Sequence, residues 1–158
     1  MLTFRRAATG AVIALTSLDA YWKILALRHL QEGVLEQDIG GVFGIMLHKN
    51  YGVIANTPIP LSIVIPVSAL ILIGCGYWLI QDSRAGKGPW PTVLQLGLVT
   101  LILGASGNLV DRVVNGFTTD FLILFGRSVV NIADGLILIG VALIIFSTNK
   151  VPIKPPTT

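Results

Sequence analysis

The sequence contains little charge and almost no cysteine, and both shortages exclude classes of protein. Only 12% of its 158 residues are charged, whereas 53% are hydrophobic. A soluble domain has about twice that charged fraction, and the mean hydropathy here is +0.79. The single cysteine, Cys75, excludes an intramolecular disulfide. We therefore expect an integral membrane protein with a few spans joined by short connections.

Clusters of metal ligands and of basic side chains are also missing. His29 and His48 each stand without a second ligand at a metal-binding spacing, so we expect no metal site. The sequence pI is about 9.3. However, the basic residues are scattered at the ends of apolar segments, which is typical of membrane orientation. We therefore expect no nucleic-acid partner.

Four apolar segments are long enough to cross a membrane, because about 20 helical residues span its hydrocarbon core of roughly 30 Å. We expect a single integral membrane domain over residues 1–158. Its fold class would be all-α, a four-helix membrane bundle, followed by a polar and disordered tail at 148–158. The predicted spans cover residues 8–28, 61–80, 91–108 and 128–147.

The segment 29–60 differs from these spans in composition. It mixes acidic and apolar residues and contains five glycines. This pattern indicates strands or irregular structure on the membrane surface rather than a helix that crosses it.

The distribution of basic residues predicts the orientation. With four spans, both termini and the turn at 81–90 share one side, which holds six basic residues and one acid, Asp82. The positive-inside rule puts that side, with both termini, in the cytoplasm. A group of polar residues then lies at the outer face: Asn108, Asp111, Asp120, Asn131 and Asp134.

Two carboxylates in this group fall where one apolar segment ends and the next begins, and a carboxylate near hydrocarbon is a candidate functional group. They are Asp120 and Asp134, and Asn131 shares a helix face with Asp134. If the two carboxyl groups are held close together, they share a proton. The ionised group can then activate water while the protonated group donates to a peptide bond.

Spacing alone leaves other interpretations open for these polar residues. Asp134 can equally be a buried polar residue satisfied by a neighbouring helix. Asn108 and Asp111, followed by Arg112, share a helix face and also fit a helix end with a capping network and an ion pair. On this evidence alone a structural role is favoured for each of them.

Five short motifs resemble those of the lipoprotein signal peptidase (signal peptidase II) family, the membrane aspartyl endopeptidases of bacteria. The resemblance covers about residues 7–147, and its strength lies in the order of the five motifs along the chain. They are Asp19-Ala20-Tyr21-Trp22-Lys23 for D-x-x-x-K, Asn50-Tyr51-Gly52 for N-x-G, Gly107-Asn108-Leu109-Val110-Asp111-Arg112 for G-N-x-x-D-R, Thr119-Asp120-Phe121 for V-D-F, and Asn131-Ile132-Ala133-Asp134 for N-x-A-D.

The resemblance implies an aspartic endopeptidase that removes signal peptides from diacylglyceryl-modified prolipoproteins and cuts just before the lipidated cysteine. Asp120 and Asp134 would form the catalytic dyad. Residues that support the site or face the substrate would be Asn108, Asp111, Arg112, Asn131, Asn50, Asp19 and Lys23. The segment 29–60 would form a small β-rich extracytoplasmic cradle.

The same resemblance implies no metal and no organic cofactor. The expected partners are the prolipoprotein substrate and membrane lipid, and we expect a monomer. The expected location is the bacterial cytoplasmic (inner) membrane, with a multi-pass chain and the active site at the outer face.

The chain departs from the family pattern at Ala55, Val130 and Gly135 and in its short connection at 121–130, which leaves substrate preference and cradle geometry open. Two alternative functions remain open, and only the first rests on these departures. One is a non-catalytic relative that binds lipoprotein precursors. The other is a small proton-linked membrane carrier, against which the clustering of the acids on one side counts.

Overall fold

The computed structural model describes residues 2–52, 59–85 and 92–148. Within these ranges the chain forms four helices and four strands. In chain order they are α1 (Leu2–His29), β1 (Leu35–Ile39), β2 (Phe43–Asn50), α2 (Leu61–Arg84), α3 (Val93–Asn115), β3 (Thr118–Leu124), β4 (Ser128–Val130) and α4 (Ile132–Thr148).

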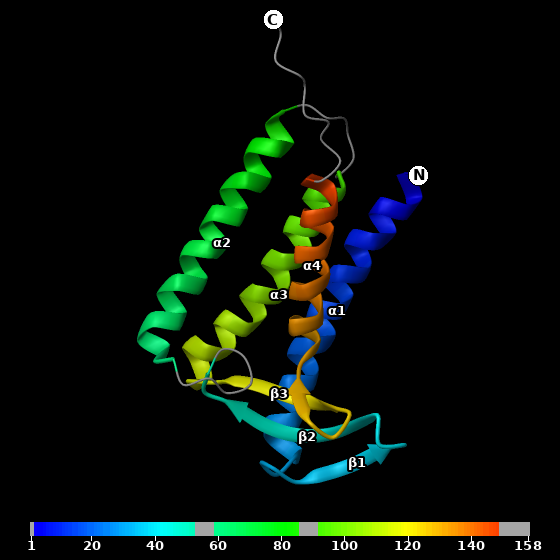
Figure 1. The fold of residues 1–158 in the computed structure, drawn as a ribbon, viewed down its shortest axis with the longest axis vertical. Coiled ribbons are helices and arrows are strands. Elements are labelled where there is room, and N and C mark those ends of the chain that lie inside the picture. Colours follow the sequence, from blue (N-terminus) through cyan, green and yellow to red (C-terminus); the bar gives the residue numbers. More distant parts are fainter. Residues whose placement is uncertain (1, 53–58, 86–91, 149–158) are drawn as a thin grey trace, which may run out of the picture.

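The helices stand side by side, and the sheet lies across one end of them (Figure 1). Helix α3 is central, because it contacts each of the other three helices, and its contact with α4 is the most extensive. The beginning of α1 and the end of α4 lie at the end of the molecule away from the sheet.

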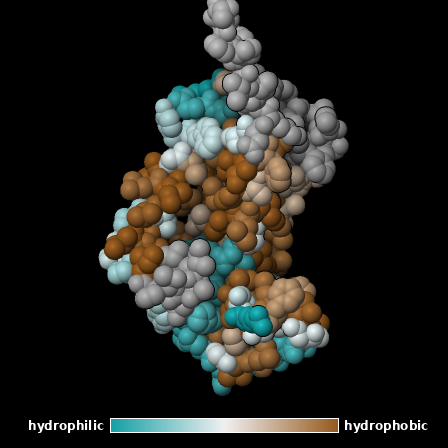
Figure 2. Space-filling model, in the orientation of Figure 1, coloured by the Kyte–Doolittle hydropathy of each residue, from teal (hydrophilic) through white to brown (hydrophobic). Residues whose placement is uncertain are grey.

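Three of the described helices are long and apolar enough to cross a membrane: Arg6–His29, Leu61–Arg84 and Val93–Asn115. Helix α4 is apolar but has only 17 residues, which at about 1.5 Å per residue is roughly 26 Å. Figure 2 shows mostly hydrophobic surface over the helices, with hydrophilic surface gathered toward the two ends of the molecule. The mostly helical membrane protein expected from composition is confirmed.

The predicted boundaries of the fourth span and of the β-rich part were wrong. The span expected at 128–147 begins only at Ile132, because residues 128–130 pair with β3 as strand β4. The sheet is therefore not limited to 29–60, and the chain is not all-α. The tail expected at 148–158 lies outside the described residues except for Thr148, which ends α4.

The sheet is antiparallel throughout, with strand order β1-β2-β3-β4. Strand β3 follows α3 after a short turn, because Gly116 ends α3. This glycine has a left-handed φ of 77°, which other residues adopt only with strain. Pairing of β2 with β3 then sets Asn50 opposite Thr118 and His48 opposite Asp120.

A small apolar core joins the sheet to α1. Ala26 of α1, Leu47 of β2 and Phe121 of β3 are buried together there, and the ring of Trp22 stacks on Phe121 with a centroid distance of 6.2 Å. Because Phe121 follows Asp120 in β3, this core holds the strand that carries the first aspartate of the predicted dyad.

Glycines let α3 and α4 approach each other closely. A Cβ added at Gly140 would lie 2.6 Å from the backbone nitrogen of Leu101, and one at Gly104 would lie 2.8 Å from the carbonyl oxygen of Ala133. Small residues are used in this way at the contacts between membrane helices. The close contact brings Asn108 of α3 next to the first turn of α4.

Candidate active site

Asp120 lies on β3 and is 1% exposed. Its Oδ2 accepts a hydrogen bond from Asn50 Nδ2 at 3.0 Å, and its Oδ1 accepts one from Asn131 Nδ2 at 2.6 Å. Burial raises the pKa of Asp120 from its ordinary value of 3.8 to about 7, and the nearby carboxylate of Asp134 acts in the same direction. The two amide donors lower this pKa only in part.

Asp134 lies in the first turn of α4, where it forms a reciprocal cap with Asn131. The backbone N–H of Asp134 donates to Asn131 Oδ1 at 2.9 Å, and the backbone N–H of Asn131 donates to Asp134 Oδ2 at 3.2 Å. This is a capping box, which satisfies two backbone donors at a helix start. Asn131 therefore contacts both aspartates and holds them in one unit.

The other carboxylate oxygen of Asp134, Oδ1, is bound by a residue of α3, and a residue of α1 orients that contact. Asn108 Nδ2 donates to Asp134 Oδ1 at 2.8 Å, and Lys23 Nζ donates to Asn108 Oδ1 at 2.7 Å. An ammonium group can only donate hydrogen bonds, so Lys23 must face the carbonyl oxygen of the Asn108 amide. The amide nitrogen of Asn108 is thereby directed at Asp134.

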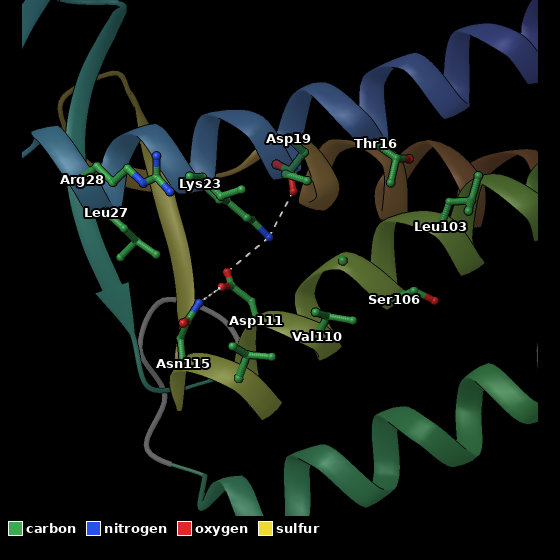
Figure 3. A pocket seen from close by; sticks show the side chains of 14 residues that line it. Thr16, Asp19, Lys23, Leu27, Arg28, Leu103, Ser106, Val110, Asp111 and Asn115 are labelled. Carbon is green, nitrogen blue, oxygen red and sulfur yellow. Dashed lines mark hydrogen bonds and ion pairs between the residues drawn. The ribbon is translucent and has the colours of Figure 1, made fainter.

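Lys23 is paired with two buried carboxylates, one on its own helix α1 and one on the neighbouring helix α3 (Figure 3). Its Nζ lies 3.1 Å from Asp19 Oδ2 and 3.4 Å from Asp111 Oδ2. The side chains of all three residues are less than a tenth exposed. A buried cation and buried anions are each costly alone, so the three charges depend on one another.

Asp19 also caps the start of α4. Its Oδ1 accepts the backbone N–H of Ile132 at 2.9 Å and that of Ala133 at 3.1 Å. The first backbone donors of a helix have no partner within the helix, and a carboxylate is favourable at its positive end. One carboxylate of α1 thus positions the helix that carries Asp134.

Asp111 connects α3 to β3. Its Oδ2 accepts the backbone N–H of Thr119 at 2.6 Å, and its Oδ1 accepts the side-chain amide of Asn115 at 2.6 Å. The hydroxyl of Thr119 donates to the same Oδ1 at 3.2 Å. Because Thr119 directly precedes Asp120, this link sets where Asp120 lies relative to α3.

The two aspartates line one cavity of about 430 Å³, which α2, α3, α4 and the sheet enclose. Arg112 also lines it, and its terminal nitrogen donates to the carbonyl oxygen of Gly52 at 3.5 Å. The Nε of Arg112 is buried and makes no hydrogen bond with the described residues. Apolar walls come from Val129, Val130 and Ile137 among others.

The structure brings all nine residues singled out in the sequence into this region. Sequence reasoning quoted Thr119 in a motif but did not predict its contact with Asp111. It missed Asn115, although the i, i+4 spacing of Asn115 from Asp111 was a signal. It also missed Ser68 of α2, which lines the cavity and which no motif marks. Among the described residues, no three His, Cys, Asp or Glu side chains are grouped so that they could hold a metal ion.

The three single-residue departures from the family pattern differ in where they lie relative to the cavity. Val130 lines it. Gly135 is exposed, and a Cβ added there would meet nothing within 4 Å. Ala55 lies outside the described residues. Only Val130 among them can therefore be connected to the cavity on this geometry.

Comparison with known proteins places this arrangement in a family. The family model described as signal peptidase (SPase) II matches residues 11–150. The chain is 29% identical over 149 residues to the lipoprotein signal peptidase of Caulobacter vibrioides, with 90% of this chain and 84% of the relative covered. It is 31% identical over 135 residues to that of Brevibacillus brevis, with 82% and 85% covered.

Solved structures of other proteins share this fold. One described as a bacterial membrane enzyme superposes with a TM-score of 0.75 at 25% sequence identity, and covers 93% of this chain and 95% of its own. A second with the same description has a TM-score of 0.74 at 24% identity, with 94% of each chain covered. The arrangement of four helices and a terminal sheet is therefore shared with an enzyme of bacterial membranes.

Proposed function

This chain belongs to the signal peptidase II family, and from that membership we propose that it cleaves diacylglyceryl-modified prolipoproteins just before the lipidated cysteine, using Asp120 and Asp134. The observation that carries the proposal is the position of Asn131. It contacts both carboxyl groups at the edge of one cavity, with hydrogen-bond distances of 2.6 and 3.2 Å. Two carboxyl groups held in this way suit a shared proton and acid–base catalysis.

We assign the proton of the resting pair to Asp120. Burial raises the pKa of Asp120 to about 7, which keeps its carboxyl group largely protonated below neutral pH. Asp134 instead accepts hydrogen bonds from Asn108 and from the backbone of Asn131, at the positive end of α4. Asp134 is also less buried than Asp120, so we assign the role of the base to Asp134.

The reaction then proceeds in two steps. Asp134 takes a proton from a water molecule, whose oxygen attacks the carbonyl carbon of the scissile peptide, while Asp120 protonates the carbonyl oxygen. The resulting tetrahedral intermediate loses its C–N bond as Asp134 passes its proton to the leaving amine. Asp120 recovers a proton from the intermediate as the carboxylic acid product forms, and the pair returns to its starting state.

Arg112 is positioned to bind the substrate backbone. Its guanidinium group lines the same cavity as the two aspartates, and its Nε has no partner among the described residues. A buried donor without a partner is costly, and a substrate carbonyl would satisfy it. We therefore assign Arg112 to substrate positioning rather than to proton transfer.

The membrane orientation is part of the proposal. The site and the sheet lie at one end of the helices, whereas the beginning of α1 and the end of α4 lie at the other. This arrangement, together with the positive-inside rule, supports cytoplasmic termini and a site at the outer face of the inner membrane.

The test uses purified protein in detergent with a diacylglyceryl-modified peptide that contains the cleavage site. Asp120→Asn and Asp134→Asn should each reduce kcat by at least about a thousandfold, since each removes one proton-transfer group. Asp38→Asn is the matched control, because Asp38 is an exposed residue of β1 whose Oδ1 accepts a hydrogen bond from the backbone N–H of Gly41. Normal processing by either active-site variant would refute the dyad. Binding without cleavage by the unmodified protein would instead favour the non-catalytic relative.

A further inference from the structure

A second and larger cavity lies between α1 and α3, on the other side of the buried charge cluster (Figure 3). It has a volume of about 610 Å³. Lys23 and Asp111 line it, whereas the Asn108 and Asp134 side chains line the active-site cavity. We call it the α1–α3 groove, and its other lining residues include Thr16, Ala20, Leu27, Arg28, Leu103 and Val110.

The length and the opening of the groove match one leaflet of a membrane. Its lining runs along α1 from Thr16 to Arg28, which at about 1.5 Å per residue is roughly 18 Å. Half of a hydrocarbon core is roughly 15 Å. Val110 and Val114 of α3 are 60% and 72% exposed beside it. Both walls belong to helices suited to cross the membrane, so the groove opens to the surrounding hydrocarbon.

A positive charge stands at the end of the groove that lies nearest the sheet. Arg28 is in the last turn of α1 and is exposed. It makes no hydrogen bond or ion pair with any residue that the structure describes. Lys23, about one and a half helical turns deeper, is by contrast paired with two carboxylates. The charge available to a ligand is therefore at the membrane edge, where phospholipid headgroups lie.

We propose that the α1–α3 groove binds a glycerophospholipid of the leaflet next to the sheet, with one acyl chain along the groove and the phosphate on Arg28. The acyl chain would cover the Asp19–Lys23–Asp111 cluster from the side away from the active-site cavity. Excluding water from these charges strengthens their attraction. Lipid in the groove would thus stabilise the cluster that orients Asn108, whether or not the chain cleaves prolipoproteins.

Photo-crosslinking in lipid nanodiscs tests the site. The probe is phosphatidylglycerol with a diazirine on one acyl chain, and mass spectrometry locates the labels. Labels should concentrate on α1 and α3 peptides that line the groove. Ala20→Phe and, separately, Val110→Trp should reduce this labelling by at least fivefold by filling the space. Ala14→Phe is the control, because Ala14 is exposed on the same helix and does not line the groove.

The headgroup contact and the source of the lipid are tested in two further arms. Arg28→Gln should reduce phosphatidylglycerol labelling by about fivefold, the effect of one basic residue near a lipid surface. It should leave labelling by a diazirine diacylglycerol unchanged. Equal labelling by both probes in the unmodified protein would overturn the phosphate contact. Uniform labelling of all helices would overturn the groove. Displacement by excess diacylglyceryl-modified peptide would identify substrate, not phospholipid, as the occupant.

Discussion

Lys23 Nζ donates a hydrogen bond of 2.7 Å to Asn108 Oδ1, and this contact determines which way the Asn108 amide faces. The amide nitrogen is left to donate to Asp134 at 2.8 Å. A cation on α1 thus controls a hydrogen bond to the proposed base without touching it. Lys23 is therefore a positioning residue, and its charge is balanced by Asp19 and Asp111.

Replacing Lys23 by Met should destabilise the protein by about 3–5 kcal/mol, because two buried carboxylates lose their cation. Lys49→Met is the control, since Lys49 of β2 pairs at 3.4 Å with Glu32 and both side chains are partly exposed. Such a surface pair contributes roughly 0–1 kcal/mol. Thermal unfolding in detergent measures both variants. Equal stability of the two would show that the buried cluster does not hold the helices together.

Two substitutions of Asn131 should separate its capping role from its contact with Asp120. Asn131→Ala removes both and should cost about 1 kcal/mol of stability, the usual effect of losing a helix cap. Asn131→Ser retains an acceptor for the backbone N–H of Asp134 but has no amide to reach Asp120. Stability should then be largely kept, while kcat falls about tenfold, the size of one lost buried hydrogen bond. A Ser variant with full kcat would contradict a catalytic role for the 2.6 Å contact.

The pH profile of cleavage should fall on its alkaline side near neutrality. Burial raises the pKa of Asp120 to about 7, and the proposed mechanism needs that carboxyl group protonated. Above this pH, kcat/KM should drop by about tenfold per pH unit, as for a single essential acid. Measurements between pH 5 and 9 with the lipidated peptide give the profile. A rate that stays constant to about pH 9 would remove Asp120 as the acid.

The same raised pKa makes stability depend on pH in a defined direction. Between about pH 4 and 7 the folded protein holds a proton on Asp120 that the unfolded chain has already lost. The stability associated with Asp120 is therefore complete below pH 4 and is lost as the pH rises to about 7. The Asp120→Asn variant has no titratable group at this position. As the pH rises through that window, the Tm of the unmodified protein should therefore fall relative to the Tm of the variant.

The close contact between α3 and α4 predicts opposite effects of alanine at two helical glycines. Gly140→Ala places a Cβ 2.6 Å from the backbone nitrogen of Leu101, and such overpacking costs about 1–3 kcal/mol. Gly74→Ala in α2 meets nothing within 4 Å and should stabilise by up to about 1 kcal/mol through helix propensity. Thermal unfolding distinguishes them. Comparable Tm values would mean that the two helices separate more easily than their spacing indicates.

Much of the helical framework could be read from the sequence, because long apolar runs have few alternatives to a membrane helix. The errors came where short segments take their structure from distant partners. Val129 and Val130 continue the apolar run of α4, yet they pair with β3 and form a strand. Their β-branched side chains suit either state, so only the neighbouring strand decides between them.

In the site as well, some features could be read from the sequence and others depend on contacts between distant segments. Motif order marked nine residues, and the i, i+4 spacing of Asp19 and Lys23 indicated that they pair. Nothing local indicated that the other oxygen of Asp19 caps α4, because the residues it contacts are 113 and 114 positions away. The contact of Thr119 with Asp111 was missed for a related reason, since it forms across the turn that follows α3. Asn115 was missed although its i, i+4 spacing from Asp111 was visible in the sequence.

The sequence by itself determined that the chain is a membrane protein and which family it resembles, and it predicted the site residues, because composition and ordered motifs are properties of the chain alone. Only the tertiary structure decided that Asn131 holds Asp120 and Asp134 together and that Lys23 directs the amide of Asn108. These relations depend on the close approach of α3 and α4 and on β3 meeting β4. Contacts between distant segments arise when helices and strands pack, and residue spacing does not encode their geometry.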